Sequence, residues 1–269
     1  MESKNLQGKY VNVNGLNMYY EIHGTGQPLV LLHGAFSAIG TSFGKLLAEL
    51  VKTRQVIAFE MQAHGRTADI DRPLSLEQMA DDTAAALRQL GIEQADFFGY
   101  SMGAGIALHI AIRHPDRVRK LVLASVTYRL EGIHSGLMEG LADMKPEMMF
   151  GSPWHEEYLQ IAPNPDSFAT LFAKKTQMDR EIRDLPAEAI QAIQSPTLLI
   201  IGDSDIVRPE HAVEMFRLLG GGVFGDIAGL PNSQLAVLPG TTHVTLVHRA
   251  DLLLAIIPPF LDAPVPESK

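Results

Sequence analysis

Short apolar strands alternate with helices along most of this 269-residue chain. Residues 28–34 (PLVLLHG), 197–203 (TLLIIGD) and 234–240 (QLAVLPG) are rich in leucine and β-branched residues. Stretches with helical spacing, such as residues 75–91, lie between runs of this kind. Strands that are apolar on both faces and are separated by helices form a parallel sheet covered by helices on both sides. The alternation therefore restricts the chain to an α/β fold.

Two segments depart from this alternation. Residues 10–22 alternate on either side of Asn14 and Gly15, which predicts an antiparallel hairpin at the start. Residues 130–194 contain no strand pattern and are rich in methionine and aromatic residues. Because a structureless loop of that length is unusual in a compact domain, we expect a helical insertion there. Residues 1–129 and 195–269 would then form the core domain.

The helix expected at residues 75–91 has signals at both ends. Ser75 and Gln78 have the spacing of a capping box, in which each side chain bonds the backbone of the other. Gly91 supplies a stop, because glycine readily adopts the left-handed conformation that ends a helix.

Charge and composition exclude several classes of function. The net charge is −9, which argues against nucleic acid and anionic membranes as partners. The chain has no cysteine, which excludes disulfides, thiolate nucleophiles and cysteine-based zinc sites. The first ten residues lack the features of a secretory signal, and no apolar run approaches the ~18 residues of a membrane helix. We expect a cytoplasmic protein.

Residues 99–103 (GYSMG) lie between an expected strand and an expected helix. The pattern G-x-S-x-G also arises by chance, so its position gives it meaning. A sharp strand-to-helix turn places the serine in a strained conformation, which flanking glycines accommodate. The hydroxyl then projects beyond the carboxyl end of the sheet, beside the positive end of a helix. This arrangement predicts that Ser101 is a nucleophile.

An acid and a base follow two later strands. Asp203 and Asp205 come after residues 197–202, and His243 comes after residues 234–240. The order serine, aspartate, histidine is the one expected of a triad at the strand ends of such a sheet. We favour Asp205 over Asp203 as the acid, and His243 over His248 as the base.

Attack on a carbonyl also requires backbone N–H groups that bind the oxyanion. One donor should be Met102, which directly follows the serine. The second should come from the loop after an early strand, and Ala35 in residues 31–36 (LLHGAF) is the candidate. We expect His33 to organise this loop through a hydrogen bond rather than to act as a base.

Together, LLHGAF, GYSMGAG, IGDSD and PGTTH resemble the α/β-hydrolase superfamily, in its cap-bearing esterase and lactonase branch. The resemblance implies an eight-stranded sheet whose second strand is antiparallel, with a helical cap between the sixth and seventh strands. The family's G-x-x-D spacing falls on Gly202 and Asp205. Two segments differ from the family: residues 60–67 (EMQAHGRT) replace the usual D-x-x-G-x-G-x-S, and HGAF replaces a three-glycine run.

The function expected from these residues is hydrolysis of carboxylic esters with small to medium apolar acyl groups. Ser101 would form an acyl-enzyme, without a metal ion or other cofactor. Methionine and aromatic side chains suit an adaptable apolar pocket. We expect Phe36, Met144 and Trp154 to line it.

Several alternatives remain open. Lactones, including acyl-homoserine lactones, would be opened by the same steps. Cofactor-free perhydrolysis or haloperoxidation and a small-molecule receptor are two further possibilities. Nucleotide binding is disfavoured, because GYSMGAG lacks the G-x-G-x-x-G spacing. Metal-dependent hydrolysis is disfavoured because no H-E-x-x-H occurs. The oligomeric state is left open.

Overall fold

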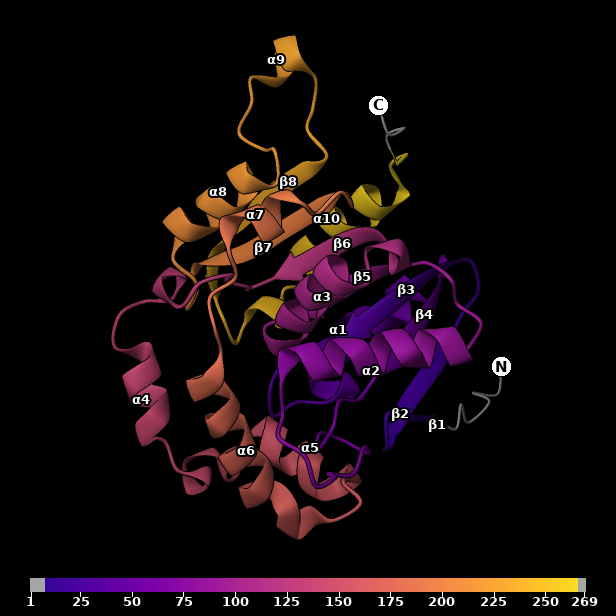
Figure 1. The fold of residues 1–269 in the computed structure, drawn as a ribbon, viewed down its shortest axis with the longest axis vertical. Helices are drawn as coiled ribbons and strands as arrows, with labels where there is room; N and C mark the ends of the chain where they lie inside the picture. Colours follow the sequence, from indigo (N-terminus) through magenta and orange to yellow (C-terminus); the bar gives the residue numbers. More distant parts are fainter. Residues whose placement is uncertain (1–7, 266–269) are drawn as a thin grey trace.

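An eight-stranded sheet forms the centre of the protein, with helices on both of its faces (Figure 1). The computed structural model describes residues 8–265. The strands lie in the order β1-β2-β4-β3-β5-β6-β7-β8, and β2 is antiparallel to both of its neighbours while the pairs from β4 to β8 are parallel. The strand bounds are β1 Lys9–Val13, β2 Leu16–His23, β3 Gln27–Leu32, β4 Arg54–Phe59, β5 Ala95–Tyr100, β6 Val118–Ala124, β7 Thr197–Ser204 and β8 Ser233–Thr242. The predicted fold class is confirmed.

The opening hairpin turns at the two predicted residues. Asn14 and Gly15 have φ angles of 49° and 84°, and Val13 pairs with Leu16 across the turn. Two central residues with positive φ define the turn whose twist matches that of paired strands, and asparagine followed by glycine favours it.

The strands bury side chains on both faces of the sheet. In β3, Val30 and Leu32 pack into one apolar cluster and Leu29 and Leu31 into the other. Helices α2 (Leu76–Gln89), α3 (Met102–Arg113) and α8 (Pro209–Leu218) contribute to the first cluster. Helices α1 (Ile39–Leu50) and α10 (Ala250–Asp262) contribute to the second. This two-sided burial explains why the central strands are apolar at successive positions.

The start of α2 shows only half of the predicted capping box. The Ser75 hydroxyl accepts a hydrogen bond from the backbone N–H of Gln78 at 3.1 Å. The Gln78 side chain, however, donates to Asp82 at 3.1 Å instead of returning to Ser75. The prediction of the reciprocal bond is therefore wrong: the Gln78 side chain extends along the helix to the buried Asp82 carboxylate, one turn on, and not back to the Ser75 N–H. Gly91 ends the helix with φ of 72°, as expected.

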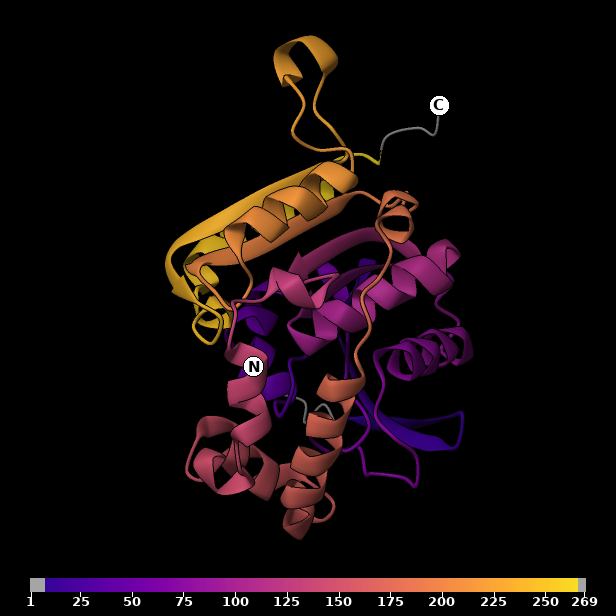
Figure 2. The same ribbon diagram turned by 60° about the vertical axis from the view of Figure 1, so that its left-hand side comes forward.

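The segment between β6 and β7 is helical. It contains α4 (Leu137–Asp143), α5 (Pro153–Ile161), α6 (Phe168–Glu181) and α7 (Ala187–Gln191). Figure 2 shows α4, α5 and α6 grouped at one end of the molecule. The two chain segments that connect this group to the sheet are bonded to each other, since the Leu185 N–H donates to the Tyr128 carbonyl at 2.8 Å.

A short turn precedes the helix that closes the fold. Residues 246–248 form a separate 3-10 turn, and α10 starts at Ala250 and continues through Pro258 and Pro259. A short helix, α9 (Gly225–Ala228), precedes β8 on a loop that projects from the body (Figures 1 and 2). Within residues 8–265, no helix has both the length and the apolar character needed to cross a membrane.

Candidate active site

Ser101 occupies the junction between β5 and α3 in a strained conformation. Its φ and ψ are 54° and −118°, a combination that residues other than glycine rarely adopt. The surrounding backbone holds it there: the Ser101 N–H donates to the Ala124 carbonyl at 2.9 Å, and the Gly105 N–H donates to the Ser101 carbonyl at 3.0 Å. These bonds hold Ser101 in a turn between the end of β5 and the start of α3, outside both regular elements.

The two glycines of the pentapeptide allow a close crossing of backbones. A Cβ on Gly99 would lie 2.2 Å from the carbonyl oxygen of Gly103. A Cβ on Gly103 would lie 1.9 Å from the carbonyl oxygen of Leu32 in β3. Neither neighbour is a flexible side chain, so any residue larger than glycine would force α3 away from the sheet.

His243 lies between Ser101 and Asp205. Its Nε2 is 2.9 Å from the Ser101 Oγ, and its Nδ1 is 2.9 Å from Asp205 Oδ1. A carboxylate beside Nδ1 favours the tautomer with its proton on Nδ1, which leaves Nε2 free to accept the serine proton. The arrangement can therefore deprotonate Ser101 and stabilise the imidazolium that results. Within residues 8–265, no three His, Asp or Glu side chains are grouped as ligands for a metal ion.

The Asp205 carboxylate is buried and bonded on both oxygens. Oδ2 accepts from the Ser125 hydroxyl and from the Gly202 N–H, and Oδ1 accepts from the Ile206 N–H at 2.7 Å. Burial acts to raise the pKa of Asp205, but the bond and charge of His243 and the donors Ser125 and Gly202 outweigh it. The net result is a pKa below the usual range, so the carboxylate stays ionised.

Asp203 does not reach the histidine and has a different position. Its carboxylate accepts from the backbone N–H groups of Gly240 at 2.8 Å and Thr241 at 3.1 Å, near the end of β8. These bonds tie the β7 loop to the segment that leads into His243. The structure thus brings Asp205, the favoured candidate, to the histidine, and leaves Asp203 as a loop contact.

Two further residues near His243 were missed in the sequence. The Tyr100 hydroxyl donates to the His243 carbonyl at 2.8 Å, and the two rings lie 5.3 Å apart. Ser125 follows β6 and bonds Asp205, as described above. Tyr100 ends β5, directly before Ser101, and Ser125 follows β6, which pairs with β7. Their position at the carboxyl end of a strand is the sequence signal that identifies them.

The loop after β3, residues 33–38, lies against the serine turn. A Cβ on Gly34 would lie 2.9 Å from the Tyr100 ring and 3.7 Å from the Ser101 Cβ. The next residue is Ala35, and Met102 is the first residue of α3. The two expected oxyanion donors therefore belong to segments that meet at Ser101.

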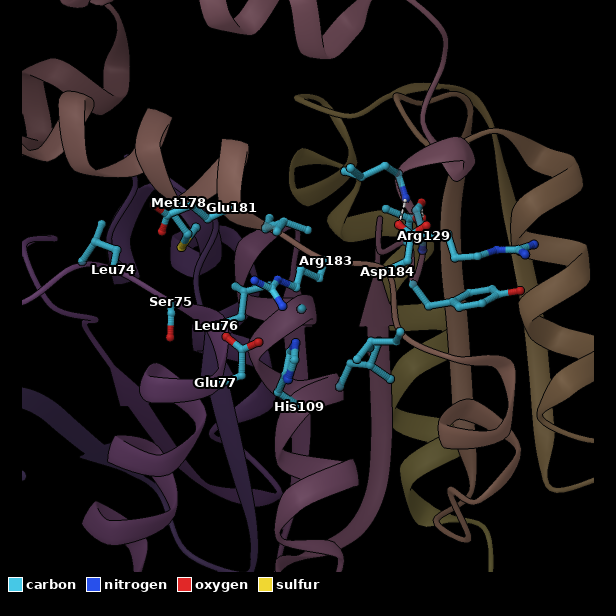
Figure 3. A pocket seen from close by; sticks show the side chains of 17 residues that line it. Leu74, Ser75, Leu76, Glu77, His109, Arg129, Met178, Glu181, Arg183 and Asp184 are labelled. Carbon is cyan, nitrogen blue, oxygen red and sulfur yellow. Dashed lines mark hydrogen bonds between the residues drawn. The ribbon is translucent and has the colours of Figure 1, made fainter.

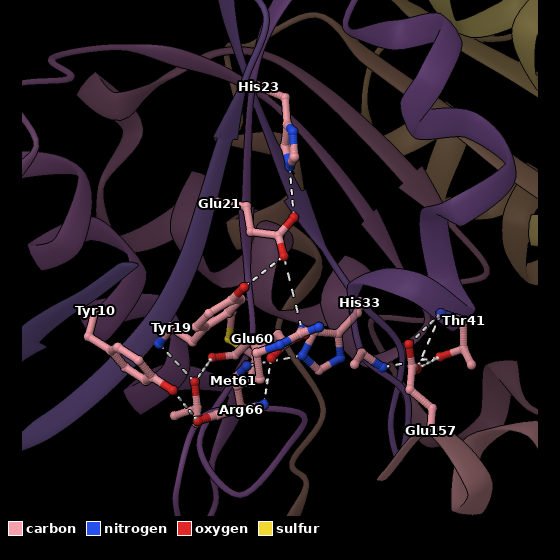
Figure 4. Close-up of polar contacts among 12 residues, drawn as sticks. Tyr10, Tyr19, Glu21, His23, His33, Thr41, Glu60, Met61, Arg66 and Glu157 are labelled. Atoms are coloured by element: carbon pink, nitrogen blue, oxygen red, sulfur yellow. Dashed lines mark hydrogen bonds and ion pairs between the residues drawn. The ribbon is translucent and has the colours of Figure 1, made fainter. Parts of the chain in front are cut away.

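His33 organises this loop. The Met61 N–H donates to His33 Nε2 at 3.0 Å, so the ring proton is on Nδ1, which lies 2.7 Å from the Gly34 carbonyl (Figure 4). Burial lowers the pKa of His33 to about 4, although the bond to Gly34 acts against it. The imidazole is thus neutral at pH 7, with both nitrogens used in structural bonds.

Glu60, which stands where the resemblance implies another acid, directly precedes Met61 (Figure 4). Its fully buried carboxylate accepts from the backbone N–H of Arg66 at 2.5 Å and from the Arg66 guanidinium at 2.8 Å. Burial raises the pKa of Glu60 to about 7, against the lowering effect of Arg66. Gly65 has φ of 53°, and a Cβ there would lie 2.4 Å from the Glu60 carboxylate. The longer glutamate is therefore accommodated by the altered loop.

The expected pocket residues lie where the core meets the inserted helices. Phe36, in the loop after β3, stacks on Phe172 of α6 with ring centroids 5.4 Å apart. Met144 and Trp154 are partly buried against the main apolar cluster. A cavity of about 80 Å³ lies elsewhere, between α2, α3 and the end of α6, and His109 and Arg183 are among its lining residues (Figure 3). Neither Ser101 nor the three expected pocket residues line that cavity.

Residues 27–180 match the model of the family described as alpha/beta hydrolase fold. The chain belongs to the α/β-hydrolase family. This α/β hydrolase is 31% identical over 222 residues to 2-hydroxymuconate semialdehyde hydrolase of Pseudomonas sp. (strain CF600), covering 75% of this chain and 78% of that protein. It is 27% identical to the pimeloyl-[acyl-carrier protein] methyl ester esterase of Neisseria meningitidis serogroup C, covering 86% and 92% of the two chains.

Among solved structures, the α/β hydrolase is similar to a serine-to-alanine variant of the meta-cleavage product hydrolase from Pseudomonas fluorescens IP01. The TM-score is 0.74 at 21% sequence identity, and the match covers 95% of this chain and 97% of the other. At that identity the likeness shows the fold. The family match and the sequence relatives identify the protein as a hydrolase.

Proposed function

We propose that the protein is a serine hydrolase of carboxylic esters with small to medium apolar acyl groups. The observation that supports this most is the position of His243, at 2.9 Å from both the Ser101 hydroxyl and the Asp205 carboxylate. Ser101 lies on a strained turn at the N-terminus of a helix, where free N–H groups and a partial positive charge favour an oxyanion.

The proposed reaction has two halves. As the Ser101 Oγ attacks the ester carbonyl, its proton passes to His243 Nε2, and Asp205 stabilises the imidazolium. The N–H groups of Met102 and Ala35 donate to the oxyanion. The alkoxide then leaves with the proton from His243, which gives an acyl-enzyme and a free alcohol. Water, deprotonated by His243, attacks the acyl-enzyme, and the carboxylic acid and free Ser101 are released.

The inserted helices supply the proposed substrate pocket. We assign residues 130–194 to a cap domain and the rest of the chain to the core domain. Phe36 from the core faces Phe172 and Phe168 of the cap, which favours an apolar acyl group. Met144 and Trp154 are the cap residues proposed to contact it. A small-molecule ester is the expected partner.

A panel of p-nitrophenyl esters with acyl chains of two to about twelve carbons tests the proposal. We expect multiple turnovers, with the highest kcat/KM for short or medium chains. Ser101→Ala should reduce kcat by about 10⁶-fold, as in other serine hydrolases that lose the nucleophile. Hydrolysis that persists in Ser101→Ala at the wild-type rate would overturn the assignment.

Lactones are the second candidate substrates, since ring opening uses the same steps. The same panel therefore includes simple lactones and acyl-homoserine lactones. It also includes 2-hydroxymuconate semialdehyde, the compound named for one relative, which is an acid and an aldehyde but not an ester. The ratio of kcat/KM between linear esters and these compounds decides among the classes of substrate.

A further inference from the structure

Helix α1 begins directly after residues 33–38, here called the oxyanion loop, and its N-cap residue offers no side-chain acceptor. Its first residue is Ile39, and the preceding residue is Ala38, whose side chain has no oxygen. The first N–H groups of a helix have no partner within the helix and require an acceptor from elsewhere. The start of α1 is therefore a point at which another element can fix the loop that contains Ala35.

The acceptor comes from the inserted helices. Both carboxylate oxygens of Glu157, on α5, lie 3.2 Å from the backbone N–H of Thr41. The Thr41 hydroxyl donates to the same carboxylate (Figure 4). A negative charge at the N-terminus of a helix is favourable, because the helix dipole is positive there. Glu157 thus caps a helix that is 116 residues away in the sequence.

Gly40 leaves space for the contact between Glu157 and Thr41. A Cβ at position 40 would lie 2.2 Å from Glu157 Oε1, so a larger residue there would displace the carboxylate from this position. The contact also continues toward the loop, because the Thr41 hydroxyl accepts from the Ala38 N–H at 3.1 Å while it donates to Glu157. The Thr41 hydroxyl therefore connects the Glu157 carboxylate to the backbone N–H of Ala38, three residues after Ala35.

The same loop contacts the inserted helices at a second point. Phe36 has φ of 61° and stacks on Phe172 of α6. On its other side the loop is fixed to the core, where His33 Nε2 accepts from the Met61 N–H at 3.0 Å. Ala35 lies between these anchors, so the position of its N–H depends on inserted helices as well as on the core.

We propose that Glu157 is a positioning residue for catalysis: its contact with the start of α1 holds the oxyanion loop, and hence the Ala35 N–H, in place beside Ser101. The inference rests on the proposed function of Ala35 as an oxyanion donor. It assigns to the inserted helices a role in forming the oxyanion hole, in addition to covering the substrate.

The test compares Glu157→Ala and Glu157→Gln with the matched control Glu156→Gln. Glu156 is the preceding residue of the same helix and is exposed, and its carboxylate lies 3.8 Å from His155 Nδ1. We expect kcat to fall about tenfold in Glu157→Ala and about threefold in Glu157→Gln, with KM within about twofold of wild type, since the loss affects the transition state. Glu156→Gln should match the wild type.

A second measurement separates positioning from a loss of stability. An alkylboronic acid forms a tetrahedral adduct with the serine, and one of its oxygens occupies the oxyanion site. Its affinity should fall by the same factor as kcat/KM in each Glu157 variant. Thr41→Val, which removes the hydroxyl and retains the N–H, should lower both, and the double variant Thr41→Val with Glu157→Ala should lose less than the product of the two single effects.

Three outcomes test whether Glu157 positions the oxyanion loop. If wild type hydrolyses esters and Glu157→Ala keeps its kcat and its boronate affinity, the inference is wrong. If Glu157→Ala does not fold, Glu157→Gln and Thr41→Val decide by the same two readouts, and wild-type values in both overturn the inference. If wild type turns over no ester but binds the boronate at Ser101, the proposed function fails, and a wild-type boronate affinity in the Glu157 variants still overturns the positioning role.

Discussion

At the residue scale, Asp205 receives donors on both of its oxygens besides the contact with His243. These donors keep the carboxylate ionised and fix its orientation toward the imidazole. Asp205→Asn removes the charge and presents an amide to the ring, which disfavours the tautomer that can accept the serine proton. We expect kcat to fall about 10³–10⁴-fold. The measurement is kcat on the best p-nitrophenyl ester, with circular dichroism to show that the fold is retained.

Asp226→Asn is the control for this change, because Asp226 is exposed on the projecting loop before β8. It should leave kcat at the wild-type value. A kcat for Asp205→Asn within a factor of ten of wild type would contradict the role of Asp205 as the acid of the triad.

Ser125 offers a finer test of the same carboxylate. Ser125→Ala removes the hydroxyl donor to Asp205 Oδ2 and leaves the contact with His243. Because a donor that stabilises the charged form is lost, the pKa of Asp205 should rise. We expect kcat to fall about tenfold, since a bond to a charged group contributes about 1.5–3 kcal/mol. The pH–rate profile should also move its acid limb upward, and an unchanged profile with unchanged kcat would count against this role.

At the element scale, the crossing of α3 over the sheet requires Gly103. Gly103→Ala would place its Cβ 1.9 Å from the Leu32 carbonyl, so α3 and the serine turn must shift. We expect the free energy of unfolding to fall by about 4 kcal/mol or more, in the range of strained backbone positions. Gly44→Ala is the control, because a Cβ there meets nothing within 4 Å and the residue lies in helix α1.

Urea unfolding measures both variants. Gly44→Ala should gain about 0.5–1 kcal/mol, since alanine is the better helix former. An equal free energy of unfolding for Gly103→Ala and wild type would contradict the requirement for glycine, because the backbones of α3 and β3 could then separate without loss of stability.

The functional residues that follow the strands could be predicted from the sequence, whereas the contacts made by the inserted helices could not. Asp205 and His243 each follow an apolar run and a glycine, and parallel strands bring such positions to one edge of the sheet. The contact of Glu157 with Thr41 has no such signal, because it depends on how α5 packs against α1. For the same reason, the Gln78 side chain was assigned to its local partner, Ser75, although a carboxylate was available to it in the folded helix.

At the scale of the whole molecule, buried histidines make stability depend on pH. Burial lowers the pKa of His33 to about 4 and of His64 to about 3, and it also lowers the pKa values of His109 and His211. Between those values and the ordinary value of 6.5, the unfolded chain binds more protons than the folded protein. The stability is therefore complete above about pH 6.5 and is lost as the pH falls.

Glu60 has the opposite effect in part of this range. Its folded pKa of about 7 lies above the ordinary 4.5, so between these values the folded protein holds a proton that the unfolded chain releases. One proton changes the free energy of unfolding by about 1.4 kcal/mol per pH unit. His33 and His64 together contribute a loss of about 2.7 kcal/mol per unit as the pH falls from 6.5 to 4.5, Glu60 offsets about 1.4 kcal/mol of it, and His109 and His211 add to the loss.

Glu60→Gln should therefore steepen the acid destabilisation, because it removes an opposing proton and leaves the histidines in place. We expect the slope between pH 6.5 and 4.5 to become steeper than that of wild type by about 1.4 kcal/mol per unit. Urea unfolding at half-unit pH intervals measures both slopes. A wild-type free energy of unfolding that stays level or rises on acidification would contradict the burial of neutral His33 and His64. An equal slope in Glu60→Gln would contradict the raised pKa of Glu60, because that variant can no longer take up the proton.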